Sequence, residues 1–115
     1  MVKKPRLWTY TITIAEQDRE IVILPDITST WKLRSGDTIK FINNTKYEVT
    51  VKVSPDGWLD GQPIVIKGSS EQSRGVSGMP DPGTTLRFTF SISANGGVFM
   101  VSGGPKMAPT EPSES

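Results

Sequence analysis

Three stretches of this chain alternate apolar and polar side chains with a strict period of two: residues 7–14, 47–53 and 86–93. Successive side chains of a β-strand point to opposite faces, so each stretch predicts a strand that buries one face. No segment of ten residues carries the helical period of 3.6, and we therefore expect an all-β fold with little helix. The alternation also predicts five core side chains: Phe41, Val49, Val51, Phe88 and Phe90.

Turn residues divide the rest of the chain into further short strands. Residues 31–53 read as strand, turn, strand, turn and strand, with the first turn at Gly36 and the second at Asn43-Asn44. Glycine adopts a positive φ without strain, and Asn tolerates the left-handed region. Three apolar runs complete the set of strands, at residues 21–24, 64–66 and 98–101. Seven or eight short strands separated by turns are typical of a two-sheet sandwich or a small barrel.

The chain has 115 residues, which is the usual size of one domain. We expect that domain to span residues 1–104, followed by a flexible tail at residues 105–115 that is rich in Pro, Ser and Glu. Deleting residues 108–115 should therefore leave the fold intact. Residues 68–83 form the longest segment without a regular pattern, and loops of this length in compact domains are often functional or mobile.

The composition excludes several classes of function. The chain contains no Cys and no His, so it has no disulfide, no thiol nucleophile and neither of these common transition-metal ligands. Thirteen basic and twelve acidic residues give a net charge of +1, which provides no electrostatic reason to expect nucleic acid or an anionic membrane as a partner. No signal-peptide or transmembrane pattern is visible in the chain as given, so we expect a soluble protein and leave its compartment open.

Residues 34–44 combine a Gly-Asp-Thr turn, an apolar and aromatic strand, and a closing Asn pair. This pattern resembles the strand pair of cupredoxins, the β-sandwiches that hold blue copper sites. The Pro-Gly-Thr at residues 82–84, with the strand that follows, is similar to the penultimate strand of that family, and residues 103–107 are similar to the end of some bacterial cupredoxin-like domains. The resemblance covers residues 20–107. It implies an all-β, Greek-key two-sheet sandwich of 7–8 strands.

The same resemblance implies where a copper site would lie. The family uses a His after the Asn pair, and a Cys, a His and often a Met around the last hairpin. Those positions fall near Tyr47 and Glu48 and within residues 91–97 of this chain, where neither His nor Cys occurs. Met100 and Met107 lie nearby in the sequence, but thioether sulfur alone is a weak ligand. The resemblance therefore implies the fold without electron transfer, and we expect no cofactor and no metal site.

The first functional hypothesis is a non-enzymatic, metal-free binding or assembly module of this fold. A protein or carbohydrate partner would contact loops 54–61 and 68–83, because β-sandwich scaffolds place variable function on loops. Trp58 is the predicted binding residue, with Arg74 and Met79 as neighbours, since Trp, Arg and Met are enriched at interfaces. The competing interpretation is that Trp58 covers the end of the core as a lid.

Two alternative functions stay open. Asp56, Asp60 and Asp81 lie in two Gly- and Pro-rich loops that could share one end of a sandwich, where they would suit a divalent cation or acid–base catalysis by an enzyme. The same aspartates are also ordinary turn residues. The second alternative is a structural homo-oligomer that is joined through an exposed strand edge.

Overall fold

The computed structural model describes residues 8–25, 30–54, 57–61, 63–77, 81, 83–94, 96–101 and 106–109. Within these residues the protein consists of ten β-strands and contains no helix, so the all-β prediction is confirmed. The strands are β1 (Thr9–Gln17), β2 (Glu20–Leu24), β3 (Thr30–Leu33), β4 (Thr38–Asn43), β5 (Glu48–Ser54), β6 (Ile64–Ile66), β7 (Glu71–Gly75), β8 (Arg87–Ala94), β9 (Gly97–Val101) and β10 (Lys106–Pro109).

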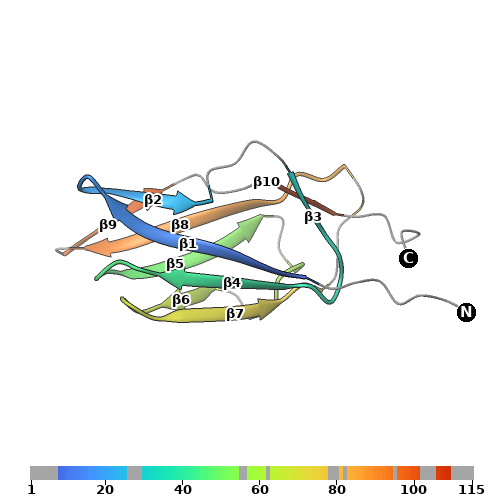
Figure 1. Ribbon diagram of the computed structural model, residues 1–115, viewed down its shortest axis with the longest axis horizontal. Coiled ribbons are helices and arrows are strands. Elements are labelled where there is room, and N and C mark those ends of the chain that lie inside the picture. Colours follow the sequence, from blue (N-terminus) through green and yellow to red (C-terminus); the bar gives the residue numbers. More distant parts are fainter. Residues whose placement is uncertain are drawn as a thin grey trace, which may run out of the picture.

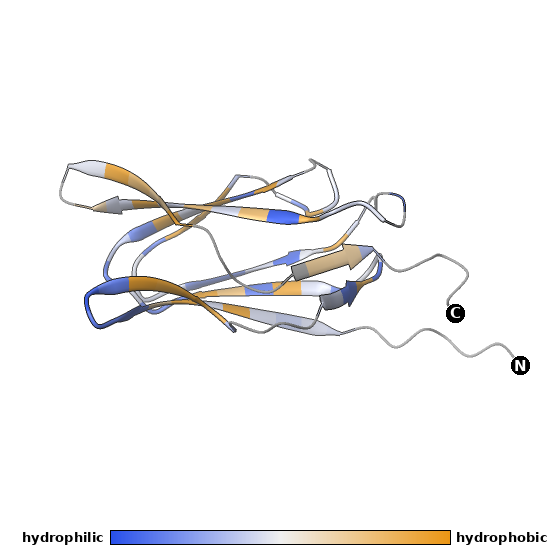
Figure 2. Cartoon of the chain, turned by 90° about the horizontal axis from the view of Figure 1, so that it is seen from above, coloured by the Kyte–Doolittle hydropathy of each residue, from blue (hydrophilic) through white to orange (hydrophobic). Residues whose placement is uncertain are grey.

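Eight of these strands form two four-stranded sheets that lie face to face (Figure 1 and Figure 2). The first sheet has the strand order β2-β1-β4-β7, and the second has the order β6-β5-β8-β9. Neighbouring strands are antiparallel except for β1 and β4, which are parallel. Strands β3 and β10 form a separate, parallel two-stranded sheet. The two main sheets make the β-sandwich that the strand pattern predicts.

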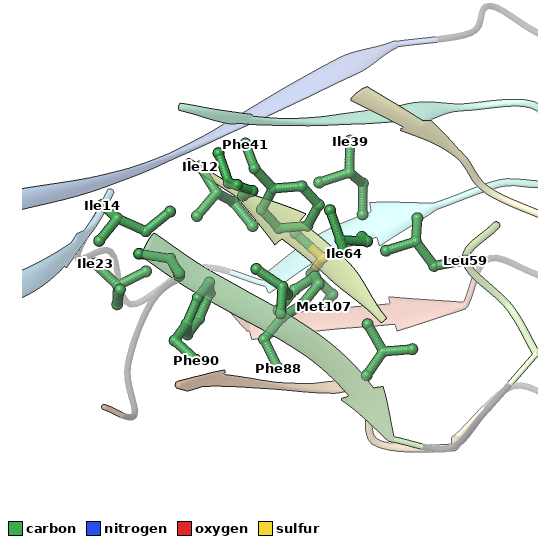
Figure 3. Close-up of a cluster of buried hydrophobic side chains, with 14 of the residues drawn as sticks. Ile12, Ile14, Ile23, Ile39, Phe41, Leu59, Ile64, Phe88, Phe90 and Met107 are labelled. Atoms are coloured by element: carbon green, nitrogen blue, oxygen red, sulfur yellow. The ribbon is translucent and has the colours of Figure 1, made fainter. Parts of the chain in front are cut away.

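The inward side chains of the two main sheets form one buried core (Figure 3). Strand β5 illustrates the pattern, because Val49, Val51 and Val53 are buried while the side chains between them are partly or fully exposed. The ring of Phe88 packs edge-on against the ring of Phe41, with centroids 5.8 Å apart, and so joins the two sheets. The five predicted core side chains are all buried, so the predicted inward faces of these strands are confirmed.

Two sharp turns depend on the local sequence. Gly36 has a φ of 99° in the turn before β4, a conformation that side chains with a Cβ rarely adopt. Gly68, between β6 and β7, lies against the neighbouring turn, and a Cβ on it would be 2.7 Å from the backbone oxygen of Lys46. The turns that precede β5 and β7 can therefore pack together only if residue 68 has no side chain.

Strand β7 corrects the sequence analysis, which assigned residues 68–83 to one irregular loop. Its five residues have no alternating apolar pattern, because the strand lies at the sheet edge and carries polar side chains. It forms by pairing antiparallel with β4, with Gln72 opposite Phe41 and Arg74 opposite Ile39. Backbone hydrogen bonds form this ladder, and they leave no signature in hydrophobic periodicity.

Strand β10 corrects a second prediction, which placed residues 106–109 in the tail. It pairs in parallel with β3, and the side chain of Met107 is buried in the core. Ala108 and Pro109 continue the strand, so deleting residues 108–115 would remove half of β10. Regular structure therefore extends past the expected domain boundary at residue 104. Residues 110–115 of the predicted tail lie outside the described residues.

Strand directions place the connections at two opposite ends of the sandwich (Figure 1). Residues 18–19, 44–47 and 67–70 make tight turns at one end. Residues 34–37, 57–61 and 76–77 lie at the other, which we call the loop end. Residues 57–61 of the first proposed contact loop and residues 76–77 of the second thus approach each other at the loop end.

Candidate functional site

Trp58, the predicted binding residue, lies at the loop end, but its side chain is fully buried at 0% exposure. Its ring packs edge-on against Phe88, with centroids 5.7 Å apart and an interplanar angle of 66°. A binding residue would need an accessible ring, and this ring is not accessible. It closes the end of the core, as the lid interpretation states, and no partner can contact its ring in this conformation.

Backbone contacts hold the Trp58 segment in place. Leu59 forms an isolated β-bridge with Val76, and the backbone nitrogen of Ser77 donates a 2.7 Å hydrogen bond to the backbone oxygen of Trp58. The backbone nitrogen of Asp60 donates to the oxygen of Gly75 at 3.0 Å. Residues 57–61 are therefore tied to the end of β7, and this places the indole inside the sandwich. The indole nitrogen Nε1 has no hydrogen-bond partner among the described residues.

Arg74, the second predicted binding residue, lies on β7 and is half-buried. Its Nη1 donates hydrogen bonds of 2.9 Å to Gln72 Oε1 and to the backbone oxygen of Ser73. The side chain also lies against the Trp58 segment, because a Cβ on Gly61 would be 2.7 Å from Arg74 Nε. Met79 lies outside the described residues. Binding through loops 54–61 and 68–83 stays a prediction.

The three aspartates of the enzyme hypothesis are only partly described. Asp60 and Asp81 are exposed, and Asp56 lies outside the described residues. Asp60 Oδ1 accepts a 2.6 Å hydrogen bond from the hydroxyl of Ser77. In the described part of the chain, no three carboxylates come close enough together to hold a metal ion. The hypothesis gains no support from Asp60, whose carboxylate serves to hold two loops together.

Two buried polar side chains fix the turns on either side of β4. The carboxylate of Asp37 accepts hydrogen bonds from the backbone nitrogens of Trp8 and Arg34, at 2.9 Å and 2.8 Å. Asn43 Oδ1 accepts from the backbone nitrogen and the hydroxyl of Thr45, at 3.0 Å and 2.7 Å, and its Nδ2 donates to the backbone oxygen of Tyr47 at 2.7 Å. Both side chains already have hydrogen-bond partners within the protein and are 0% exposed, so neither is available to a ligand.

The surface that stands out lies instead on strand β9. Three consecutive apolar side chains are exposed there: Val98 at 68%, Phe99 at 43% and Met100 at 63%. Strand β9 is the last strand of its sheet, and among the described strands it pairs with β8 alone. We call these three residues and their backbone the β9 edge. Clustered exposed apolar side chains of this kind are typical of contact sites rather than of free surface.

The β9 edge also exposes backbone hydrogen-bonding groups. Ala94 and Gly97 are opposite each other across a two-residue turn, so Phe99 and Val101 direct their backbone groups toward β8. Antiparallel geometry then directs the N–H and C=O groups of Val98 and Met100 away from the sheet. A strand placed along this edge would find both apolar side chains and unpaired backbone groups.

The other three edges of the two main sheets carry protective features. Strand β7 carries the charged side chains of Glu71 and Arg74. Strand β6 has only three residues, between Pro63 and Lys67, and β2 is followed by Pro25. Charge, proline and short length are the usual means by which a sheet edge avoids pairing with another chain. Strand β9 contains neither a charge nor a proline.

The apolar run at residues 98–101 predicts strand β9 but does not by itself mark a site. The available signal was the run Val-Phe-Met-Val without a charged or polar residue, which is longer than one buried face requires. Comparison with known protein families and with curated proteins finds no match for this chain. No helix in the described part of the chain could cross a membrane. The candidate site therefore depends on geometry alone.

Proposed function

We propose that this protein is a non-enzymatic, metal-free binding or assembly module with a cupredoxin-like Greek-key fold. The strand order supports the topology, because the chain passes from one main sheet to the other after β4, after β6 and after β7. Such crossings between the two sheets are typical of Greek-key sandwiches. The buried Asp37 and Asn43, which lie in the segment that resembles cupredoxins, support the same proposal.

The observation that carries the functional part of the proposal is the exposure of three successive apolar side chains on the β9 edge. An isolated strand edge of this composition promotes aggregation, and proteins retain one chiefly where another chain covers it. Contact through an added strand provides affinity by backbone hydrogen bonds and specificity by alternate side chains. The β9 edge is a better candidate for the contact site than the Trp58 segment, because the ring of Trp58 is buried in the core.

The proposal is tested by the size of the complex that the protein forms in an extract of the cells that make it. A tagged wild-type chain is compared with Met100→Lys, which places a charge on the edge and opposes strand pairing. Val65→Lys is the matched control, since Val65 is also an exposed apolar residue but lies on the opposite edge strand, β6.

We expect the wild-type chain and the Val65→Lys control to elute as a complex larger than the monomer. The Met100→Lys chain should elute as a monomer with an unchanged melting temperature. Elution of all three chains as monomers, or equal complexes from all three, would contradict a contact at β9.

A further inference from the structure

We infer that the β9 edge binds a second copy of this chain, so that two β9 strands pair antiparallel across a two-fold axis at Phe99. The inference rests on the proposed function and identifies the partner of the same surface. The product would be one continuous sheet of eight strands, in which the two copies of β9 lie at the centre.

The backbone groups of β9 suit this symmetric register. Val98 and Met100 direct their N–H and C=O groups outward, as described above, and they are spaced symmetrically around Phe99. A two-fold axis at Phe99 places Val98 of one copy opposite Met100 of the other. Both outward residues of each copy then find hydrogen-bonding partners at once. An axis at Val98 would place Met100 opposite residue 96, in the turn before β9. An axis at Met100 would place Val98 opposite residue 102, beyond the end of the strand.

The side chains in this register match as well. Phe99 lies on the core side of its sheet, opposite Ile92, so the two Phe99 rings would meet on the same face at the axis. This cross-strand pair does not exchange hydrogen bonds, and such pairs bring side chains closest together. On the outer face, Val98 would contact Met100 of the other copy, and each exposed apolar side chain thus gains an apolar neighbour.

Charge favours a second copy over a charged partner. Strand β9 has no charged residue, and its outer-face neighbours on β8 are Ser91 and Ser93. Two identical edges can therefore approach without like-charge repulsion, which would oppose a symmetric pairing of charged strands. A strongly acidic or basic partner would find no complementary charge on these residues. An identical strand, in contrast, is complementary to every position of β9.

The short strand limits the strength of the dimer. A five-residue edge buries less area than the roughly 1,200 Å² of a standard stable interface. We therefore expect a reversible monomer–dimer equilibrium rather than an obligate dimer. In a closed two-fold dimer each β9 edge is buried against the other, so assembly stops at two chains.

The absence of Cys from the chain allows a direct test of the register. A single Phe99→Cys substitution would place two thiols opposite each other at the axis, within the Cα separation that a disulfide requires. The Val98→Cys control would place its thiols two residues out of register, at a Cα separation of about 8 Å. Disulfides rarely bridge such a distance.

The purified full chain is studied by sedimentation from about 1 µM to about 1 mM, and the two Cys variants are oxidised under mild conditions. We expect wild type and Val65→Lys to approach twice the monomer mass with increasing concentration, while Met100→Lys stays monomeric. Phe99→Cys should cross-link at least ten times faster than Val98→Cys, and addition of reductant should reverse the cross-link.

Two results would overturn the inference. If the purified wild-type chain stays monomeric at the highest concentration, it has no affinity for itself and the inference fails. If the cell extract still contains a β9-dependent complex in that case, the partner is another protein and the proposed function stands. Faster cross-linking by Val98→Cys would reject the axis at Phe99. If the extract also contains no complex, the proposed function fails together with the inference.

Discussion

Strands β7 and β9 are both five residues long and both lie at the edge of a four-stranded sheet, yet they present opposite chemistry. Strand β7 consists of Glu-Gln-Ser-Arg-Gly and β9 of Gly-Val-Phe-Met-Val. Edge position therefore does not determine how a strand meets solvent. The side chains determine whether the unpaired backbone is protected or available to another chain.

Protection of β7 comes from both of its faces and from a covering loop. Gln72 and Arg74 lie opposite Phe41 and Ile39, so polar side chains point toward the core side of the sheet, which discourages pairing by another strand. Lys40 and Glu71 form an ion pair of 3.4 Å on the outer face. The Trp58 segment bonds to the end of the strand. None of these three features has a counterpart on β9 among the described residues.

The largest expected effect comes from truncating Trp58 in the loop that covers the end of β7. Trp58→Ala should lower the free energy of unfolding by about 3–5 kcal/mol, as truncation of a buried aromatic residue does. Phe99→Ala on the β9 edge is the control and should cost about 1 kcal/mol, because that ring is already half exposed. Urea denaturation of both variants measures the difference. Similar losses from the two variants would mean that Trp58 is not part of the core.

The two methionines provide the next comparison. Met107→Ala should cost about 2–5 kcal/mol, because Met107 is buried and completes the core from β10. Met100→Ala, at an exposed position on β9, should change stability by less than about 0.5 kcal/mol when measured at a concentration where the chain is monomeric. Denaturation at low protein concentration separates the two effects. A near-neutral Met107→Ala would show that β10 contributes little to the fold.

A substitution on β7 tests whether charge keeps that edge from pairing. Arg74→Leu removes the positive charge and should change stability by no more than about 1 kcal/mol. It should also allow a second edge to pair, so that dimers linked through β9 join into larger species. Light scattering detects these species. The double variant Arg74→Leu/Met100→Lys should form only small assemblies, whereas aggregation of both variants to the same extent would indicate misfolding.

The smallest expected effect concerns amide hydrogen exchange. The outward amides of Val98 and Met100 should exchange rapidly in dilute solution and become protected by up to about ten-fold when the dimer forms. Amides of β7 should show no dependence on protein concentration. Exchange measured by NMR at two concentrations distinguishes the edges. Equal protection of both strands would contradict a contact confined to β9.

Local patterns in the sequence predicted most of the sandwich. The alternation in β4, β5 and β8 placed the right side chains in the core, and the turns at Gly36 and Asn43 were found correctly. These features depend on neighbouring residues only. Each strand must bury one face, and each turn needs a residue that accepts its backbone angles.

The features that sequence reasoning missed all depend on distant partners. Trp58 is flanked in the sequence by glycines and polar residues, a context that favours exposure. The β-bridge between Leu59 and Val76 instead positions its side chain in the core. Strands β7 and β10 form because β4 and β3 offer free edges to them. The exposure of β9 likewise depends on the strand order of the sheet, which hydrophobic periodicity does not encode.

The parallel pairing of β3 with β10 also has a consequence for the protein during its synthesis. Leu33 and Pro109 are partners in register, so β3 leaves the ribosome long before β10, its one partner among the described strands, exists. At about 5–20 residues per second, roughly 4–15 seconds of translation separate them. During this interval β3 has an open edge and the core lacks Met107. Completion of β10 therefore supplies both the strand partner of β3 and the last side chain of the described core.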